Sequence, residues 1–385
     1  MPATTVATGK NNAPSAKDAP VISVPFIRAS GEHREPFIDI TSTPTTSQKD
    51  LGVFDVPAYG YLRSIVLLVE ATGGTGTGVT SHEDGPFSAL QGITLAEPNG
   101  ATIVQFNSGF ELYLAHKYGG YRDSVGADFK ASPTYSAPGA TTGNFSFMLR
   151  IPLELSSRDG LGALVNQSAA STFKLRLSLA SLASIYGATV PTTAPNVRIR
   201  AFIEAWDQPE AQTGGAVNAT TPPAPNTTQF WSSQVIPYAQ GQNTLKLSRV
   251  GNYIRNMILI LRRTGSGRAN GHNDLPDNTS LIYDTRPIDQ VERNNWLHQM
   301  YERSGYGGAS GTNVPALDTA GGLNNGVFVY DFTHEFDGTY GRENRDLWLP
   351  TLTSTRLELQ GEFKNAGSLT VLTNDVAVAG NVFFQ

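Results

Sequence analysis

The segments of this sequence closest to known chemical motifs are a glycine-rich loop and a few polar loops. Gly74-Thr-Gly-Thr-Gly78 follows an apolar run, a position at which a loop can hold phosphate groups against the start of a helix. A dinucleotide site requires the spacing G-x-G-x-x-G, and the third glycine is misplaced here. The next residues, Thr80-Ser-His-Glu-Asp-Gly-Pro86, are not typical of a helix. We therefore interpret residues 74–78 as a flexible turn.

Motifs for metal binding and for nucleophilic catalysis do not occur either. The histidines are scattered along the chain: His33, His82, His116, His272, His298 and His334. The zinc motif H-E-x-x-H fails because His334-Glu335 is followed by Phe-Asp-Gly, and neither G-K-[ST] nor G-x-S-x-G is present. We therefore predict no catalytic residue, no cofactor-binding residue and no metal site.

Two features leave alternatives open. The polar loop that contains His272 also carries Asp274, Asp277 and Asp284, whose carboxylates could supply oxygen ligands to Ca²⁺. A solvated loop accounts for the same residues, and we favour it. The 14 Tyr and 18 Phe could form a carbohydrate-binding platform. Aromatic residues at period two in strands are more typical of core and interface, and we favour that interpretation.

The composition is that of a large and weakly charged protein. Charged residues make up 16% of the 385 residues, whereas typical globular domains carry about 25%. Such a surface suits contact between copies of one chain, because charged residues are depleted from the centres of interfaces. The chain has no cysteine, which excludes disulfides and thiolate chemistry.

The charge distribution argues against direct binding of nucleic acid. The net charge is −5, and the first 30 residues carry Lys10, Lys17 and Arg28 against Asp18. Proteins that condense nucleic acid need clustered Lys and Arg to displace counterions. The sequence begins without the apolar core of a signal peptide, and no run approaches the length of a membrane-spanning helix. We expect neither a secretion signal nor a transmembrane segment.

The elements that carry these loops are predicted to be β-strands. Apolar residues alternate with polar ones at period two, which places one set of side chains on each face of a sheet. The clearest alternating segments are 145–151, 173–179, 197–204 and 357–360. Helical patterns are few and short. The expected class is therefore all-β.

The chain also repeats itself once. Tyr61-Leu-Arg-Ser-Ile-Val-Leu-Leu-Val-Glu-Ala-Thr-Gly73 aligns without gaps on Tyr253-Ile-Arg-Asn-Met-Ile-Leu-Ile-Leu-Arg-Arg-Thr-Gly265. Each copy is followed, in the same order, by a glycine-rich loop, a strand, a short helical segment, a long loop and an aromatic strand. The helical segments are 110–117 and 296–303, and the long loops are 124–143 and 305–326. We infer two copies of one domain with about eight strands, a pattern typical of a jelly roll, which closes its own edges.

Two segments without apolar periodicity predict the domain boundaries. Residues 1–35 are expected to form a flexible N-terminal arm. Residues 208–229 contain Thr221-Pro-Pro-Ala-Pro225 and are expected to form a linker, because proline blocks both helix and central strand. The first jelly roll is then predicted to span residues 36–207, and the second residues 230–385.

Short motifs in the first half carry a family resemblance. They are Gly52-Val-Phe-Asp-Val56, Asp84-Gly-Pro86, Glu97-Pro-Asn99, Ser108-Gly-Phe-Glu-Leu-Tyr-Leu114, Ala137-Pro-Gly-Ala-Thr-Thr-Gly143, Phe147-Met-Leu-Arg-Ile-Pro-Leu153, Asp159-Gly-Leu-Gly-Ala-Leu-Val-Asn166 and Phe173-Lys-Leu-Arg-Leu177. With them the chain resembles the double jelly-roll major capsid proteins of tailless, membrane-containing icosahedral double-stranded DNA bacteriophages, the tectivirus type. The second half matches mainly through the order of its elements, and none of the motifs is catalytic.

The resemblance implies two tandem eight-stranded jelly-roll barrels with short helices in the loops. One helix is implied at Asp159–Asn166, between the sixth and seventh strands of the first barrel. Family members often open with an N-terminal helix, whereas Gly9, Pro14 and Pro20 interrupt the arm here.

The function implied is that of a non-enzymatic structural protein of the virion, made in the host cytoplasm. Its homotrimers would form pseudo-hexagonal capsomers that tile an icosahedral shell. The implied partners are copies of itself, minor capsid and vertex proteins and an internal viral membrane, with no direct nucleic acid contact and no cofactor. The alternative is an extracellular two-domain β-sandwich that binds or hydrolyses glycans. The missing secretion signal and the missing disulfides weigh against it.

Overall fold

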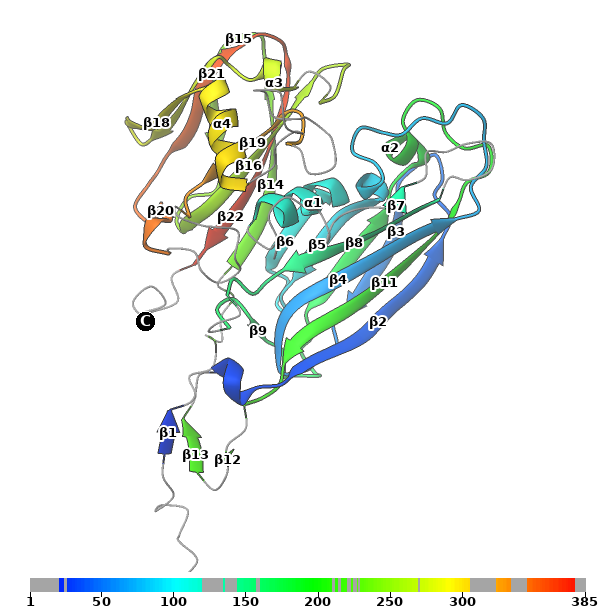
Figure 1. Cartoon of the computed structure of the whole chain (residues 1–385), viewed down its shortest axis with the longest axis vertical. Helices are drawn as coiled ribbons and strands as arrows, with labels where there is room; N and C mark the ends of the chain where they lie inside the picture. Colours follow the sequence, from blue (N-terminus) through cyan, green and yellow to red (C-terminus); the bar gives the residue numbers. More distant parts are fainter. Residues whose placement is uncertain are drawn as a thin grey trace, which may run out of the picture.

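Two β-barrels lie side by side in the computed structural model (Figure 1). The structure describes residues 21–23, 26–119, 134–135, 144–156, 160–209, 212–213, 216–219, 223, 227, 229–268, 271–304, 323–333 and 345–377. Within these ranges strands predominate and helices are short, so the expected all-β class is confirmed.

The first barrel consists of two four-stranded sheets. One has the order β2 (Glu32–Ser42), β11 (Asn196–Trp206), β4 (Tyr61–Thr72), β8 (Phe145–Pro152), with short β7 (Thr134–Tyr135) beside β8 and β9 (Leu164–Val165) beside β4. The other has the order β3 (Lys49–Asp55), β10 (Lys174–Leu179), β5 (Leu90–Ala96), β6 (Thr102–Ser108). Neighbouring strands run antiparallel. Except for β5 and β6, successive strands of the chain in these two four-stranded sheets alternate between them, so that strands distant in sequence become neighbours, which is the jelly-roll connection.

The second barrel has the same strand order. One sheet runs β14 (Gln229–Tyr238), β22 (Gly367–Val376), β16 (Tyr253–Arg263), β19 (Val327–Asp331), with β20 (Leu349–Pro350) also paired with β16. The other runs β15 (Gly241–Leu247), β21 (Leu357–Phe363), β17 (Asn278–Tyr283), β18 (Arg286–Glu292). In both barrels the first, eighth, third and sixth strands form one sheet, and the remaining four form the other.

The repeated sequence segments occupy equivalent places in the two barrels. β4 and β16 begin at Tyr61 and Tyr253, and each is the third strand of its barrel. Leu67 and Leu259 are fully buried on these strands. The buried apolar residues of both barrels form one continuous core, so the two barrels fold against each other rather than separately.

The helices lie in the connections between strands. The α-helices are α1 (Gly109–Tyr118), α2 (Leu182–Tyr186), α3 (Gly271–Asp274) and α4 (Arg293–Ser304), and the 3₁₀ turns are η1 (Phe26–Ala29), η2 (Phe87–Ala89) and η3 (Arg345–Leu347). α1 and α4 contain the predicted helical segments 110–117 and 296–303 and follow the fifth strand of each barrel. No helix in the described ranges has the length and apolarity needed to span a membrane.

The prediction of a helix at Asp159–Asn166 is wrong. Its described part lies between β8 and β10 as expected, but it forms a turn and the short strand β9. Gly160 and Gly162 have φ values of 69° and 89°, and this left-handed backbone does not continue a helix. A Cβ at Gly160 would come within 2.9 Å of the Phe26 ring, so the turn allows the chain before β2 to pack closely.

The arm and the linker meet in a small sheet below the barrels (Figure 1). β1 (Val21–Ser23) pairs in parallel with β13 (Ala216–Ala219), which pairs with β12 (Gln212–Thr213). β2 begins at Glu32, inside the segment expected to be an arm. Residues 1–20 lie outside the described residues, as do most of the loops 124–143 and 305–326. The division at residues 35, 207 and 229 stays a prediction.

Candidate functional site

The two barrels are joined along strands β6 and β14. These strands pair in parallel at Val104 and Trp231, so one sheet of the first barrel continues into one sheet of the second. Trp231 is 1% exposed and lies with its ring centre 5.7 Å from that of Phe106. We call this junction, together with α1 and the loops beside it, the seam.

An ion network crosses the seam from the loop after β4 to the end of β16. Arg268 of the second barrel donates from Nε to Asp84 Oδ1 of the first at 2.7 Å. Arg268 also donates to the carbonyl oxygens of Glu83 and Asn325, and Arg262 contacts the second oxygen of Asp84 at 2.9 Å. Because Arg268 and Asp84 are both buried, removal of either would leave an uncompensated charge inside the protein.

Helix α1 fills the space between the barrels at this point, and all ten of its residues are buried. Ser108 caps its first turn by accepting a hydrogen bond from the backbone N–H of Glu111. Glu111 in turn accepts from the N–H of Asn107 at 2.8 Å. Burial raises the pKa of Glu111 to about 7, although the hydrogen bonds of its carboxyl group with Asn107 and Ser233 and the charge of Arg262 act in the opposite direction.

Further hydrogen bonds tie the second barrel to backbone atoms of the first. Arg255 Nη1 donates to the carbonyl oxygen of Gly119 at 2.6 Å. Gln229 donates to the carbonyl oxygen of Pro152 at 3.1 Å. The paired residues lie 136 and 77 residues apart in sequence. Because each bond joins a strand of the second barrel to the backbone of the first, these contacts hold the two barrels together.

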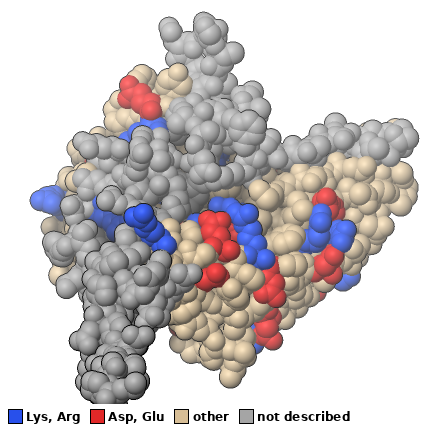
Figure 2. Space-filling model, turned by 60° about the horizontal axis from the view of Figure 1, so that its bottom comes forward, with Lys and Arg blue, Asp and Glu red and all other residues tan. Residues whose placement is uncertain are grey.

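The outer face of the sheet β2–β11–β4–β8 carries charges in pairs. Arg198 makes two hydrogen bonds with Asp39, and Arg200 pairs with Glu70. Arg150 lies 3.0 Å from Glu204. In the centre and at the right of Figure 2, acidic and basic side chains lie next to one another on the surface. Because its charges are paired, such a face does not repel a second copy of itself. It also has no excess positive charge to bind the phosphate groups of a nucleic acid.

The carboxylates of the candidate calcium loop do not point toward a common site. Asp274 binds Arg263 and Asn365, whereas Asp277 binds Arg293 at 2.9 Å. Asp284 accepts from the backbone N–H groups of Thr355 and Arg356, and the side chain of His272 lies outside the described residues. Across the part of the chain that the structure describes, no three His, Asp or Glu side chains could hold one metal ion.

Two of the other histidines make contacts typical of structural residues, and His334 lies outside the described residues. His33 stacks on Tyr59 with ring centres 3.6 Å apart, and His298 lies beside Glu302 on α4. Thr75, inside the glycine-rich loop, forms a β-bridge with Thr193, which agrees with a turn rather than a phosphate site. The predicted absence of a catalytic, cofactor or metal residue stays a prediction.

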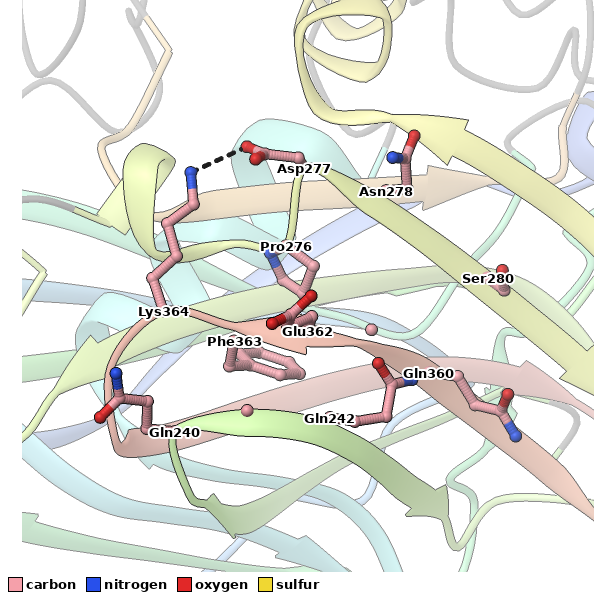
Figure 3. A pocket seen from close by; sticks show the side chains of 12 residues that line it. Gln240, Gln242, Pro276, Asp277, Asn278, Ser280, Gln360, Glu362, Phe363 and Lys364 are labelled. Carbon is pink, nitrogen blue, oxygen red and sulfur yellow. Dashed lines mark hydrogen bonds and ion pairs between the residues drawn. The ribbon is translucent and has the colours of Figure 1, made fainter.

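Sequence reasoning missed two hollows. One, of about 770 Å³, opens at an end of the second barrel (Figure 3). The other, of about 680 Å³, lies where the first barrel meets the start of β14, and Phe173 and Phe230 contribute to its lining. The hollow at the end of the second barrel has a weak signal in the sequence. Polar and apolar residues alternate along β15 and β21, so both strands place polar side chains on the outer face.

Comparison with known proteins gives structural matches alone. No family model and no curated protein matches the sequence. The major capsid protein of Sulfolobus turreted icosahedral virus matches with a TM-score of 0.59 at 14% identity, covering 91% of this chain and 97% of that one. The major capsid protein P2 of bacteriophage PM2 gives 0.51 at 10% identity, covering 92% and 100%. PBCV-1 VP54 gives 0.53 at 9% identity, covering 90% and 94%.

These matches span both barrels of the chain. At such low identity the likeness establishes the fold. The fold is that of the double jelly-roll capsid proteins, and the expected architecture of two tandem eight-stranded barrels with short helices in the loops is confirmed.

Proposed function

We propose that this chain is the major capsid protein of an icosahedral virus and that it assembles as a homotrimer with a pseudo-hexagonal outline. The observation that carries the proposal is the pair of similar barrels within one chain, joined by a shared sheet and one continuous core. Three such chains arranged about a threefold axis present six barrels, and a nearly sixfold outline tiles a facet.

The seam supports this arrangement physically. A capsomer keeps its outline only if the two barrels of each chain hold a constant angle. The parallel pairing of β6 with β14 and the buried ion pair of Arg268 with Asp84 both resist rotation of one barrel against the other. Packing of α1 between the barrels acts in the same direction.

The surfaces are also suited to contact between copies. Val53 on β3 and Val235 on β14 are 60% and 55% exposed, and β3 has a neighbouring strand on one side alone among the described pairs. The paired charges on the outer face of the first barrel allow close approach without net repulsion.

The finer expectations belong to this proposal. The virus would be of the tectivirus type, a tailless bacteriophage with an internal membrane. The chain would be made in the host cytoplasm and reside in the virion shell, in contact with copies of itself, with minor capsid and vertex proteins and with that membrane. It would be no enzyme and would bind no nucleic acid directly. Its parts would be an arm (1–35), a first barrel (36–207), a linker (208–229) and a second barrel (230–385).

The assembly state tests the proposal. Light scattering of the purified protein should give about three times the chain mass of 41.2 kDa, and negative-stain images should contain hexagonal outlines. A monomer that persists at high concentration would contradict the capsid role. It would favour the alternative, an extracellular two-domain protein that binds or hydrolyses glycans, because such a protein has no need of a trimer.

A further inference from the structure

The polar hollow of the second barrel is a built groove rather than a gap between loops. It is lined by the start of β15, the end of β21 and the residues that lead into β17. It lies at the end of the barrel where β14 turns into β15 and β21 turns into β22. In Figure 1 this end, marked by β15, is the one remote from β1 and β13.

Strand register brings polar side chains together on the wall of the groove. Gln242 of β15 stands opposite Glu362 of β21, and Gln360 stands opposite Ser280 of β17. Leu359 and Leu281, which adjoin Gln360 and Ser280, are buried, as is Leu245 farther along β15, so this second set of side chains points into the barrel. The polar set therefore faces outward, held by a hydrogen-bonded sheet instead of by a loop (Figure 3).

Several of these polar groups have no partner within the protein. Among the described residues, none forms a hydrogen bond with the solvent-exposed side-chain amides of Gln240, Gln242 and Asn278 or with the exposed carboxylate of Glu362. Each amide offers two N–H donors and one carbonyl acceptor, and the carboxylate offers further acceptors. Such a mixture matches a ligand whose groups both donate and accept, as hydroxyl groups do.

The charges of the groove exclude an anionic ligand. Lys364 is the one basic residue among those that line it, and its ammonium group is 3.0 Å from the carboxylate of Asp277. Arg293 contacts Asp277 from the other side at 2.9 Å. Since Glu362 adds a negative charge, the groove has no excess positive charge to attract phosphate, sulfate or sialic acid.

The apolar residues of the groove are covered. Phe363 is 1% exposed, and the ring of Pro276 packs against the β21 backbone, where a Cβ on Gly361 would come within 2.6 Å of it. A ligand in the groove would therefore meet a surface that is more polar than apolar, formed largely by amides, hydroxyls and carboxylates. Pockets for hydrophobic ligands have the opposite lining.

From these contacts we propose that the groove binds a neutral, hydroxyl-rich saccharide. Gln242 would hold sugar hydroxyl groups through its amide, and Gln360 through the part of its amide that is not bonded to Glu358. Glu362 would accept from the same hydroxyl groups, and Gln240 and Asn278 would close the two ends. One consequence rests on the proposed capsid role: if the N-terminal arm contacts the inner side of the shell, this groove faces outward, where surface polysaccharides of a host cell are within reach.

An oligosaccharide array tests the site on the purified protein. The array carries neutral hexose and N-acetylhexosamine oligomers next to sulfated and sialylated ones. We expect neutral oligosaccharides to bind. The double variant Gln242→Ala, Gln360→Ala should weaken their binding by roughly tenfold or more, since two hydrogen bonds are lost. Gln242→Glu keeps the size of the side chain but loses its donors, and it should also weaken binding.

The matched control is Gln48→Ala. Gln48 is an exposed glutamine on the equivalent connection of the first barrel, between β2 and β3, and its removal should leave saccharide binding unchanged. Absence of binding to every array component, preference for the acidic oligosaccharides, or equal binding by the groove variants would each overturn the proposal. Light scattering of the same samples reports the trimer independently, so failure of the capsid role and failure of the groove are distinguished.

Discussion

Arg268 of the second barrel and Asp84 of the first form a buried ion pair, 2.7 Å long, across 184 residues of sequence. The pair links the loop after β16 to the loop after β4, and these two strands carry the internal repeat. The loop of each barrel that follows the repeat contains an aspartate bound to an arginine, but only in the first does the arginine come from the other barrel. In the second barrel, Asp274 pairs with Arg263 of the same barrel.

Replacement of Asp84 tests the seam. Asp84→Asn leaves Arg268 buried without its counter-charge and is expected to lower the free energy of unfolding by about 3–5 kcal/mol. Urea unfolding followed by tryptophan fluorescence measures the change. Asp39→Asn is the control, because that carboxylate pairs with Arg198 on the exposed face of the first barrel and should matter much less. Equal losses in the two variants would mean that the seam is not a special point of stability.

Charge introduced into the repeated strands tests their equivalence. Leu67→Asp and Leu259→Asp should each cost more than about 3 kcal/mol, because an unpaired carboxylate would enter the core of its barrel. Thermal melting and soluble yield report the loss. Leu352→Asp, at a position that is 48% exposed, should be tolerated. Two soluble and fully folded core variants would refute the assignment of these segments as equivalent buried strands.

The buried carboxyl of Glu111 predicts a pH dependence of stability. Its pKa in the folded protein is about 7, raised from 4.5, so the folded state holds a proton that the unfolded chain releases between these values. The stabilising contribution is complete below about pH 4.5 and is lost as the pH rises through about 7, a change of roughly 3 kcal/mol.

Glu111→Gln removes this proton equilibrium and keeps an oxygen that can accept from Asn107. Relative to the wild type, the variant should therefore gain stability between pH 5 and pH 8. Urea unfolding of both proteins at the two pH values gives the difference and cancels the titration of all other groups. A difference that stays constant with pH, or that changes in the other direction, would show that Glu111 is ionised throughout.

The N-terminal residues 1–20 are predicted to act in shell assembly rather than in folding. They have no aromatic anchor and no clustered basic charge, so their deletion should leave the trimer and its melting temperature nearly unchanged. The same deletion should reduce the yield of particles, because a segment that orders on a neighbour makes association conditional. Particle yield by sedimentation is the measurement. Normal yield would make the segment a passive tail, and a large loss of trimer stability would mean that it is packed structure.

Local pattern alone determined much of this fold. Period-two alternation identified the strands, because the pleat sends successive side chains to opposite faces whatever the partner strand is. The duplication of the domain could be recognised in the sequence because Tyr61 and Tyr253 begin equivalent strands, in which apolar residues occur in the same order. α1 and α4 were found for a similar reason, since their helical segments recur at the same place in each half. The prediction of a helix at Asp159–Asn166 failed because Gly160 and Gly162 adopt a left-handed backbone. Gly160 packs closely against Phe26, and Gly162 against the backbone at Leu153.

Tertiary structure decided which polar side chains meet. The sequence contains Asp84, Asp274 and several arginines, but it does not say that Arg268 reaches across to the first barrel while Arg263 stays within the second. Nor does it say that Gln242, Glu362 and Ser280 share one wall of a groove, because that depends on the register of three strands distant in the chain. Alternation assigns a residue to a face of its own strand. Its neighbours on that face are chosen by the closure of the barrel, which depends on the packing of the whole core.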